Sequence, residues 1–161
     1  MVKDIDALLV DLNRFRGGIA DTSTLIYLER LGLLDLAARC FSLRVIPQVV
    51  AEFGMRPAGT IPLTAVPSGP ADLVICQEAS RLGLPVLSED RHVLRAARAG
   101  QLPYYNTLMM VLALCVQGEL APAAFADIRR ELLVFARYAP WVVAVGDALF
   151  EALCHAPTRE V

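Results

Sequence analysis

Two aspartates in this chain come directly after short apolar runs that end where a helical pattern begins. Asp21 follows Ile19-Ala20, and Asp90 follows the apolar pair Val86-Leu87 after two further residues. A buried strand that gives way to a helix places such a carboxylate at the carboxyl end of the strand. Because ligands bind at that edge in open α/β sheets, both acids are candidates for function.

Glu52 and Asp72 belong with this pair, because each stands among apolar residues of a predicted helix. If all four carboxylates converge, each pair about 4 Å apart repels by roughly 4 kcal/mol at an effective dielectric near 20, so the cluster needs a bound cation. Mg²⁺ and Mn²⁺ prefer carboxylate oxygen and water, and they leave positions for a substrate phosphate. The chemistry that this cluster suits is phosphodiester hydrolysis, in which one or two ions activate water and neutralise charge.

Each acid also has a purely structural explanation. Asp21 and Asp90 can cap helices, where a carboxylate contributes about 0.3–1 kcal/mol, but their position at two strand ends favours function. Asp72 suits a helix-start charge and a site residue equally well, and Glu52 taken alone has the pattern of a solvated helix acid.

Hydroxyl and guanidinium side chains beside the acids are candidates for supporting roles. Ser23 and Ser88 either cap helices or orient an acid or a metal-bound water. Arg91 and Arg95 lie on the predicted helix that follows Asp90. Guanidinium groups suit phosphate, and a solvated helix face explains these arginines equally well.

The elements that position these residues alternate between short apolar strands and amphipathic helices. An amphipathic helix precedes the first strand, Gly17-Gly18 breaks it, and Thr22, Ser23 or Thr24 caps the next helix. Strands are predicted near 19 and at 43–46, 63–66, 85–87 and 102–105. Helices are predicted at 25–31, 33–40, 47–53, 71–81, 90–99, 107–116, 122–136 and 146–154. Repeated strand–helix units predict an α/β fold, a three-layer sandwich with a central mainly parallel sheet flanked by helices.

Size and composition indicate one soluble domain with apolar surface to spare. A chain of 161 residues accommodates a full core. Its hydrophobic fraction of 56% and mean hydropathy of +0.51 favour a homo-oligomer or a complex. The apolar run near 107–116 is too short to cross a bilayer, and the first residues lack a signal pattern, so we expect a cytoplasmic protein without a membrane partner.

Charge and cysteine spacing exclude several classes of protein. A net charge of −2 argues against binding nucleic acid through bulk electrostatics. The four cysteines are too far apart for a zinc or redox motif, and we expect them to be buried thiols. No P-loop motif is present, and His92 and His155 are too distant in sequence to indicate histidine-based RNA cleavage.

Four segments together resemble the PIN-domain family, including toxin ribonucleases of the VapC type. They are 21–26 (DTSTLI), 46–53 (IPQVVAEF), 69–72 (GPAD) and 87–90 (LSED), and their residue types, order and approximate spacing agree with that family. The similarity covers about 19–133. It implies a PIN-like nuclease domain at 19–137, with an N-terminal amphipathic helical extension at 1–18 and a C-terminal extension packed on the domain at 138–161.

What the resemblance implies is a magnesium- or manganese-dependent endoribonuclease that hydrolyses RNA phosphodiester bonds. Four residues match the family's catalytic, metal-binding acids: Asp21, Glu52, Asp72 and Asp90. Ser88 stands where the family usually has threonine and keeps the hydroxyl. Glu89 is an unusual neighbour, which either substitutes for Asp90 or faces solvent.

The same resemblance leaves partners and a second function open. A toxin of this family needs an antitoxin protein whose peptide fills the acidic cleft, whereas a housekeeping ribonuclease has no such partner. The alternative function is a catalytically inactive PIN-like binding module that acts through protein–protein contacts. The intact acids count against that alternative, because a metal-free fold has no use for mutually repelling carboxylates.

Overall fold

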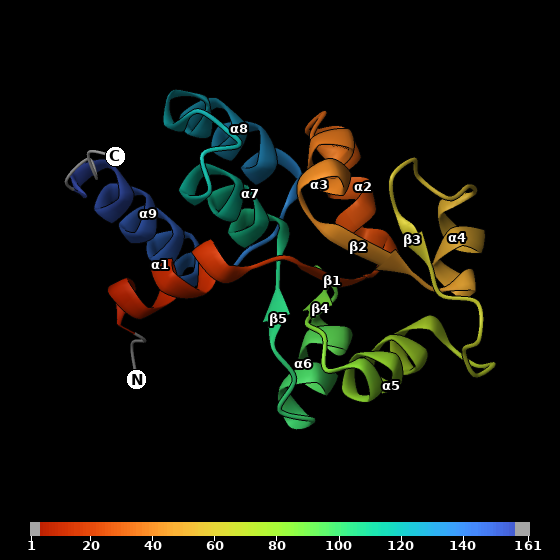
Figure 1. Cartoon of the computed structure of the whole chain (residues 1–161). Coiled ribbons are helices and arrows are strands. Elements are labelled where there is room, and N and C mark those ends of the chain that lie inside the picture. Colours follow the sequence, from red (N-terminus) through yellow and green to blue (C-terminus); the bar gives the residue numbers. More distant parts are fainter. Residues whose placement is uncertain (1–3, 157–161) are drawn as a thin grey trace. The chain divides into compact units, whose positions relative to one another are not determined.

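The computed structural model of the chain describes residues 4–156 (Figure 1). The chain forms two compact units, one of Arg16–Thr107 and one that combines Met1–Phe15 with Leu108–Val161. We call the first the α/β unit and the second the helical unit. The domain limits implied by the family resemblance, at 18/19 and 137/138, stay predictions.

The α/β unit is built on a five-stranded sheet in which every pairing is parallel. Its strands are β1 (Gly17–Ala20), β2 (Ser42–Val45), β3 (Ile61–Pro62), β4 (Val86–Leu87) and β5 (Tyr104–Tyr105). They lie in the order β3-β2-β1-β4-β5, so β1 is the central strand. All residues of β1 and β4 are buried, as expected for parallel strands that are covered on both faces.

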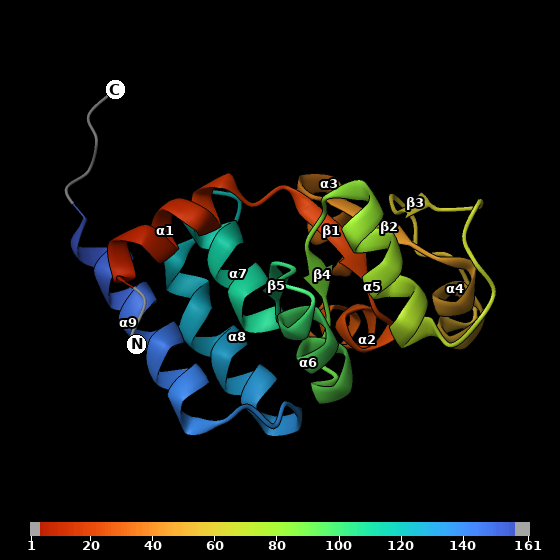
Figure 2. The ribbon, with the colours of Figure 1, turned by 90° about the horizontal axis from the view of Figure 1, so that it is seen from below.

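Helices cover both faces of this sheet. On one face lie α2 (Thr22–Arg30), α3 (Leu34–Cys40) and α4 (Pro47–Phe53), and on the other lie α5 (Ala71–Leu82) and α6 (Arg91–Ala99), as Figures 1 and 2 show. The first group is held together by contacts of α2 with α3 and α4, and α5 packs on β1, β4 and α6. The predicted α/β three-layer sandwich is therefore confirmed.

Gly18 allows the two central strands to approach closely. A Cβ atom at this position would lie 2.4 Å from the carbonyl oxygen of Pro85, the residue before β4. Gly17, with φ of +127°, meets the same limit on the other side, at 2.3 Å from the carbonyl oxygen of Ser42 in β2. The first helix already ends at Arg14, with Phe15 as its C-cap, so the expectation that the glycine pair breaks this helix is wrong. The pair instead opens the central strand.

Most predicted strand positions are confirmed, and the third is wrong. We expected it at 63–66, but the structure has β3 at Ile61–Pro62, with the amide of Leu63 donating a last bond to the carbonyl of Val45. β3 pairs only with β2, and β2 cannot continue because Pro47 begins α4. The apolar residues after Leu63 therefore have no strand to pair with.

The helical unit contains α1 (Ile5–Arg14), α8 (Pro122–Phe135), α9 (Pro140–His155) and nearly all of α7 (Thr107–Val116). α1 packs on α9, and the rings of Phe125 and Phe150 stack with centroids 4.2 Å apart. The Gln117 amide group donates to the carbonyls of Leu12 and Phe15, at 2.9 and 2.8 Å, and so satisfies the carboxyl end of α1. No helix in residues 4–156 is long and apolar enough to cross a membrane.

Three further expectations need correction. α9 begins at Pro140 and not at 146, because proline is compatible with the first turn of a helix. On α5 the predicted inward residue Leu73 is 55% exposed, and the buried face consists of Val74, Ile75, Glu78 and Ala79. We expected four buried thiols, but only Cys115 is buried, Cys154 is exposed, and Cys40 and Cys76 are half-buried.

Candidate functional site

The carboxyl ends of β1 and β4 form the point where the sheet order reverses. The chain runs from β1 outward through β2 and β3 and then returns to the other side of β1 as β4. Ala20 pairs with Leu87 at the end of both strands, and the amide of Asp21 donates to the Leu87 carbonyl at 2.8 Å. Asp21 therefore lies at the topological switch point, which is the usual ligand crevice of an open α/β sheet.

Asp21 is a buried carboxylate with three hydrogen-bond donors around it. The residue is only 8% exposed. Oδ1 accepts the Thr22 amide at 2.8 Å, and Oδ2 accepts the hydroxyls of Ser88 at 2.8 Å and Ser23 at 3.3 Å. Asp21, and not one of the hydroxyl residues after it, is thus the N-cap of α2. Asp21 therefore caps a helix and also lies at the end of a strand, which are the two positions that the sequence indicates.

Burial is the main cause that raises the pKa of Asp21 above its ordinary value. The negative charge of Glu52 raises the pKa further, whereas the Ser88 and Ser23 hydroxyls and the Thr22 amide act to lower it. Such a carboxyl group is costly to keep ionised unless a cation approaches it.

Glu52 reaches this site from α4 through Thr22. The Thr22 hydroxyl donates to Glu52 Oε2 at 2.6 Å, while the amide of the same residue donates to Asp21. One buried threonine therefore holds the two acids next to each other. The sequence indicates only a possible helix cap at Thr22, because the contact with residue 52 depends on how α2 and α4 pack.

Asp72 lies in the exposed first turn of α5, one helical turn before Cys76. Burial, then the charge of Asp72, then that of Asp21 raise the pKa of the Cys76 thiol. A thiol whose pKa is raised in this way remains protonated and is a poor nucleophile or metal ligand.

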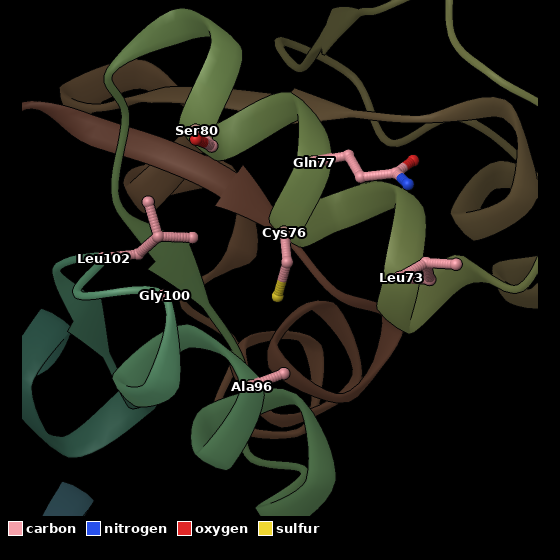
Figure 3. Close-up of a pocket in the computed structure, with 7 residues that line it drawn as sticks. All are labelled: Leu73, Cys76, Gln77, Ser80, Ala96, Gly100 and Leu102. Atoms are coloured by element: carbon pink, nitrogen blue, oxygen red, sulfur yellow. The ribbon is translucent and has the colours of Figure 1, made fainter.

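The thiol of Cys76 points into the space between α5 and α6 (Figure 3). A pocket of about 390 Å³ opens there, lined by Leu73, Cys76, Gln77, Ser80, Ala96, Gly100 and Leu102. These residues are apolar or uncharged, and none of the four candidate acids lines the pocket.

The Asp90 side chain is the N-cap of α6. It is exposed, and its Oδ1 accepts the amides of His92 at 2.7 Å and Val93 at 3.4 Å at the start of α6. Arg91 and Arg95 are exposed on the same helix. The structure thus brings Asp21 and Glu52 together through Thr22, places Asp72 at the exposed start of α5, and uses the Asp90 carboxylate for capping.

The hydroxyls of Ser23 and Ser88 each link a backbone amide of residues 89–90 to the Asp21 carboxylate through hydrogen bonds. The Ser23 hydroxyl accepts the Glu89 amide at 3.0 Å, and the Ser88 hydroxyl accepts the Asp90 amide at 3.0 Å. Because an amide can only donate, each hydroxyl proton is left to point at another acceptor, and Asp21 Oδ2 is that acceptor for both. The two serines therefore orient the acid.

In residues 4–156, no three histidine, cysteine, aspartate or glutamate side chains are arranged as they stand to hold a metal ion. Mg²⁺, however, is commonly held by one or two carboxylates together with water and substrate phosphate. The Asp21–Glu52 pair meets that smaller requirement. Within the described part of the chain, no arginine or histidine forms an ion pair with either acid.

In comparisons with protein-family models, curated proteins and solved structures, no significant match to this chain was found. The assignment of roles to residues therefore depends on the geometry of the site.

Proposed function

We propose that this protein is a metal-dependent endoribonuclease, a hydrolase of RNA phosphodiester bonds with a PIN-like α/β unit. The observation that carries the proposal is Asp21, a buried acid at the switch point of a parallel sheet and next to a second acid. Among the residues that the structure describes, no cationic side chain forms an ion pair with it. A charge in that position is expensive for the fold, and a bound divalent cation would compensate it.

In the proposed site, Asp21 and Glu52 hold Mg²⁺ or Mn²⁺. The ion would supply the activation of water and the neutralisation of charge that phosphodiester hydrolysis requires. Thr22 fixes the distance between the two acids, and Ser23 and Ser88 fix the orientation of Asp21. Asp72 and Asp90 would contact the ion through water, and Arg91 and Arg95 would contact RNA phosphates.

We further propose that the protein is cytoplasmic and associates with other chains, either as a homo-oligomer or as a toxin with its antitoxin. Apolar side chains at the surface of the helical unit support association, since Val134 is 83% and Trp141 is 68% exposed. A protein inhibitor of the toxin type would present a cationic residue to the acids.

The test is calorimetric titration of Mn²⁺ into the wild type and the Asp21→Asn variant, with cleavage of a pool of single-stranded RNA oligonucleotides measured on the same samples. We expect the variant to lose manganese binding and to cleave at least about 100-fold more slowly, because it lacks a group that acts in the transition state. Asp127→Asn, an exposed acid of α8, is the matched control and should behave as the wild type.

Full cleavage by Asp21→Asn would overturn the assignment of the site. If the wild type neither binds manganese nor cleaves RNA, the second candidate, an inactive PIN-like binding module, takes precedence. The observation in its favour is that no three acids of residues 4–156 surround one point.

A further inference from the structure

Glu89 lies between the two residues of the 87–90 segment that the sequence analysis assigned to the site. It is half-buried, and its carboxylate accepts hydrogen bonds at the start of α7. Glu89 Oε1 accepts both the amide and the hydroxyl of Thr107, each at 2.5 Å, and the Thr24 hydroxyl at 3.4 Å. One carboxylate thereby caps α7 and contacts α2.

The residues that bind Glu89 are themselves buried. Thr24 and Thr107 have no exposed surface. Hydrogen bonds from buried donors to a charged acceptor are strong, and the buried donors are expensive to leave without a partner. The position of the Glu89 side chain is consequently fixed by two elements that are distant from it in sequence.

The backbone on either side of this anchored side chain carries the two amides that bind the serines. The Glu89 amide donates to Ser23 and the Asp90 amide donates to Ser88, and both hydroxyls donate in turn to Asp21 Oδ2. A shift of the backbone at 89–90 would move both donors at once. The orientation of Asp21 therefore depends on a side chain that does not contact it.

We propose that Glu89 is a positioning residue for the reaction centre, and that it acts by hydrogen bonding to Thr107 and Thr24 and not as a metal ligand in place of Asp90. Its role in catalysis rests on the proposed function, whereas its effect on the geometry of Ser23, Ser88 and Asp21 does not. Two of the donors to Glu89 Oε1 belong to Thr107 and one to Thr24, so this oxygen joins the 87–90 segment to the start of α7 and to α2.

A positioning role and a metal-ligand role of Glu89 predict different metal affinities for Glu89→Gln. Glutamine keeps an oxygen that can accept the same bonds but loses the charge that a metal ligand needs. Glu89→Ala loses both. Thr107→Val removes only the hydroxyl donor and keeps the backbone amide, so it is a milder variant that retains the start of α7.

The experiment measures three quantities on these variants: hydrogen exchange of the amides at 89 and 90 in metal-free protein, the affinity for Mn²⁺ alone, and kcat and KM for the pool of single-stranded RNA oligonucleotides. For Glu89→Ala we expect amide protection to fall at least about tenfold, and manganese affinity and kcat to fall about 10- to 100-fold, with KM within about twofold. Glu89→Gln should remain within about threefold of the wild type, and Thr107→Val should lie between the two.

Two results would overturn the role of Glu89. If Glu89→Ala keeps the amide protection and the manganese affinity of the wild type, the side chain does not set the geometry. If Glu89→Gln loses as much manganese affinity as Glu89→Ala, the charge acts directly on the ion. A wild type without manganese binding or cleavage would instead count against the proposed function, and amide exchange would still decide whether Glu89 positions the serines.

Discussion

The two units of the chain differ in what they bury. All the buried polar residues in the described part of the chain belong to the α/β unit: Asp21, Thr22, Thr24, Thr60, Glu78, Ser88 and Thr107. The buried side chains of the helical unit, among them Leu12, Phe125 and Leu132, are apolar. Five of the seven polar residues take part in the hydrogen-bond network around Asp21 and Glu89: Asp21, Thr22, Thr24, Ser88 and Thr107.

An apolar core and a buried polar network contribute to a fold in different ways. An apolar core stabilises a fold through area removed from water and tolerates small shifts. A buried polar network contributes little net stability, but it fixes the direction of each group, and it is costly when only partly satisfied. We infer that the α/β unit sacrifices stability for a defined geometry at Asp21, whereas the helical unit contributes stability and apolar surface.

Matched glycine substitutions give the largest expected effects. In Gly18→Ala the new methyl group meets the backbone oxygen of Pro85 at 2.4 Å, so β1 and β4 must separate. We expect the free energy of unfolding to fall by about 2–3 kcal/mol, and manganese affinity to fall with it, because Asp21 and Ser88 follow these two strands.

The corresponding change in the helical unit is Gly146→Ala, where the methyl group meets the flexible end of the Leu108 side chain at 2.9 Å. The gain in helix propensity, about 0.5–1 kcal/mol, offsets the rotamer shift of Leu108. Urea unfolding should show a change within about 1 kcal/mol, with manganese affinity unchanged. Equal losses in both variants would contradict the contrast between the units.

Much of the fold is predictable from the sequence because local patterns determine it. The helix Pro47–Phe53 and the helix Thr107–Val116 have the predicted bounds, since a proline at the first turn and a sustained apolar run are local signals. The error at β3 arises because the length of a strand depends on its partner, and β2 ends before residues 63–66 can pair.

The site is predictable only in part for the same reason. The strand-end position of Asp21 follows from the sequence, and its connection to Ser88 follows once a parallel sheet is expected. The contacts of Thr22 with Glu52 and of Thr107 with Glu89 do not, because they join residues 30 and 18 positions apart across packed helices. No pattern along the chain distinguishes such a threonine from an ordinary cap.

The pH dependence of stability should sharpen the contrast. The folded state raises the pKa of Asp21 above 3.8, chiefly by burial, so it binds the proton more tightly than the unfolded chain does. The contribution of Asp21 to stability is therefore fully present below pH 3.8 and is lost as the pH rises through the folded-state pKa.

Asp21→Asn lacks this titration, so its stability relative to the wild type should increase as the pH rises through that window. Urea unfolding at a series of pH values, with chelator present, measures the difference. In Ser88→Ala the loss of a hydroxyl that lowers the pKa of Asp21 should extend the window to higher pH. A difference between Asp21→Asn and wild type that stays constant with pH would contradict the burial of a titrating carboxyl group.

The smallest expected effect concerns surface arginines. Arg91 and Arg95 stand on α6, beside the site, whereas Arg130 stands on α8 with a side chain 75% exposed. If the first two contact RNA phosphates, the double change to Gln should raise KM by roughly tenfold or less and reduce the slope of log affinity against log salt by about 0.7 for each lost contact with a single strand. kcat should not change, because phosphate contacts position the substrate and do not take part in the reaction. Arg130→Gln removes one positive charge from the helical unit. An equal effect on KM and salt dependence per charge removed would show that net charge, and not the position of α6 at the sheet edge, governs RNA binding.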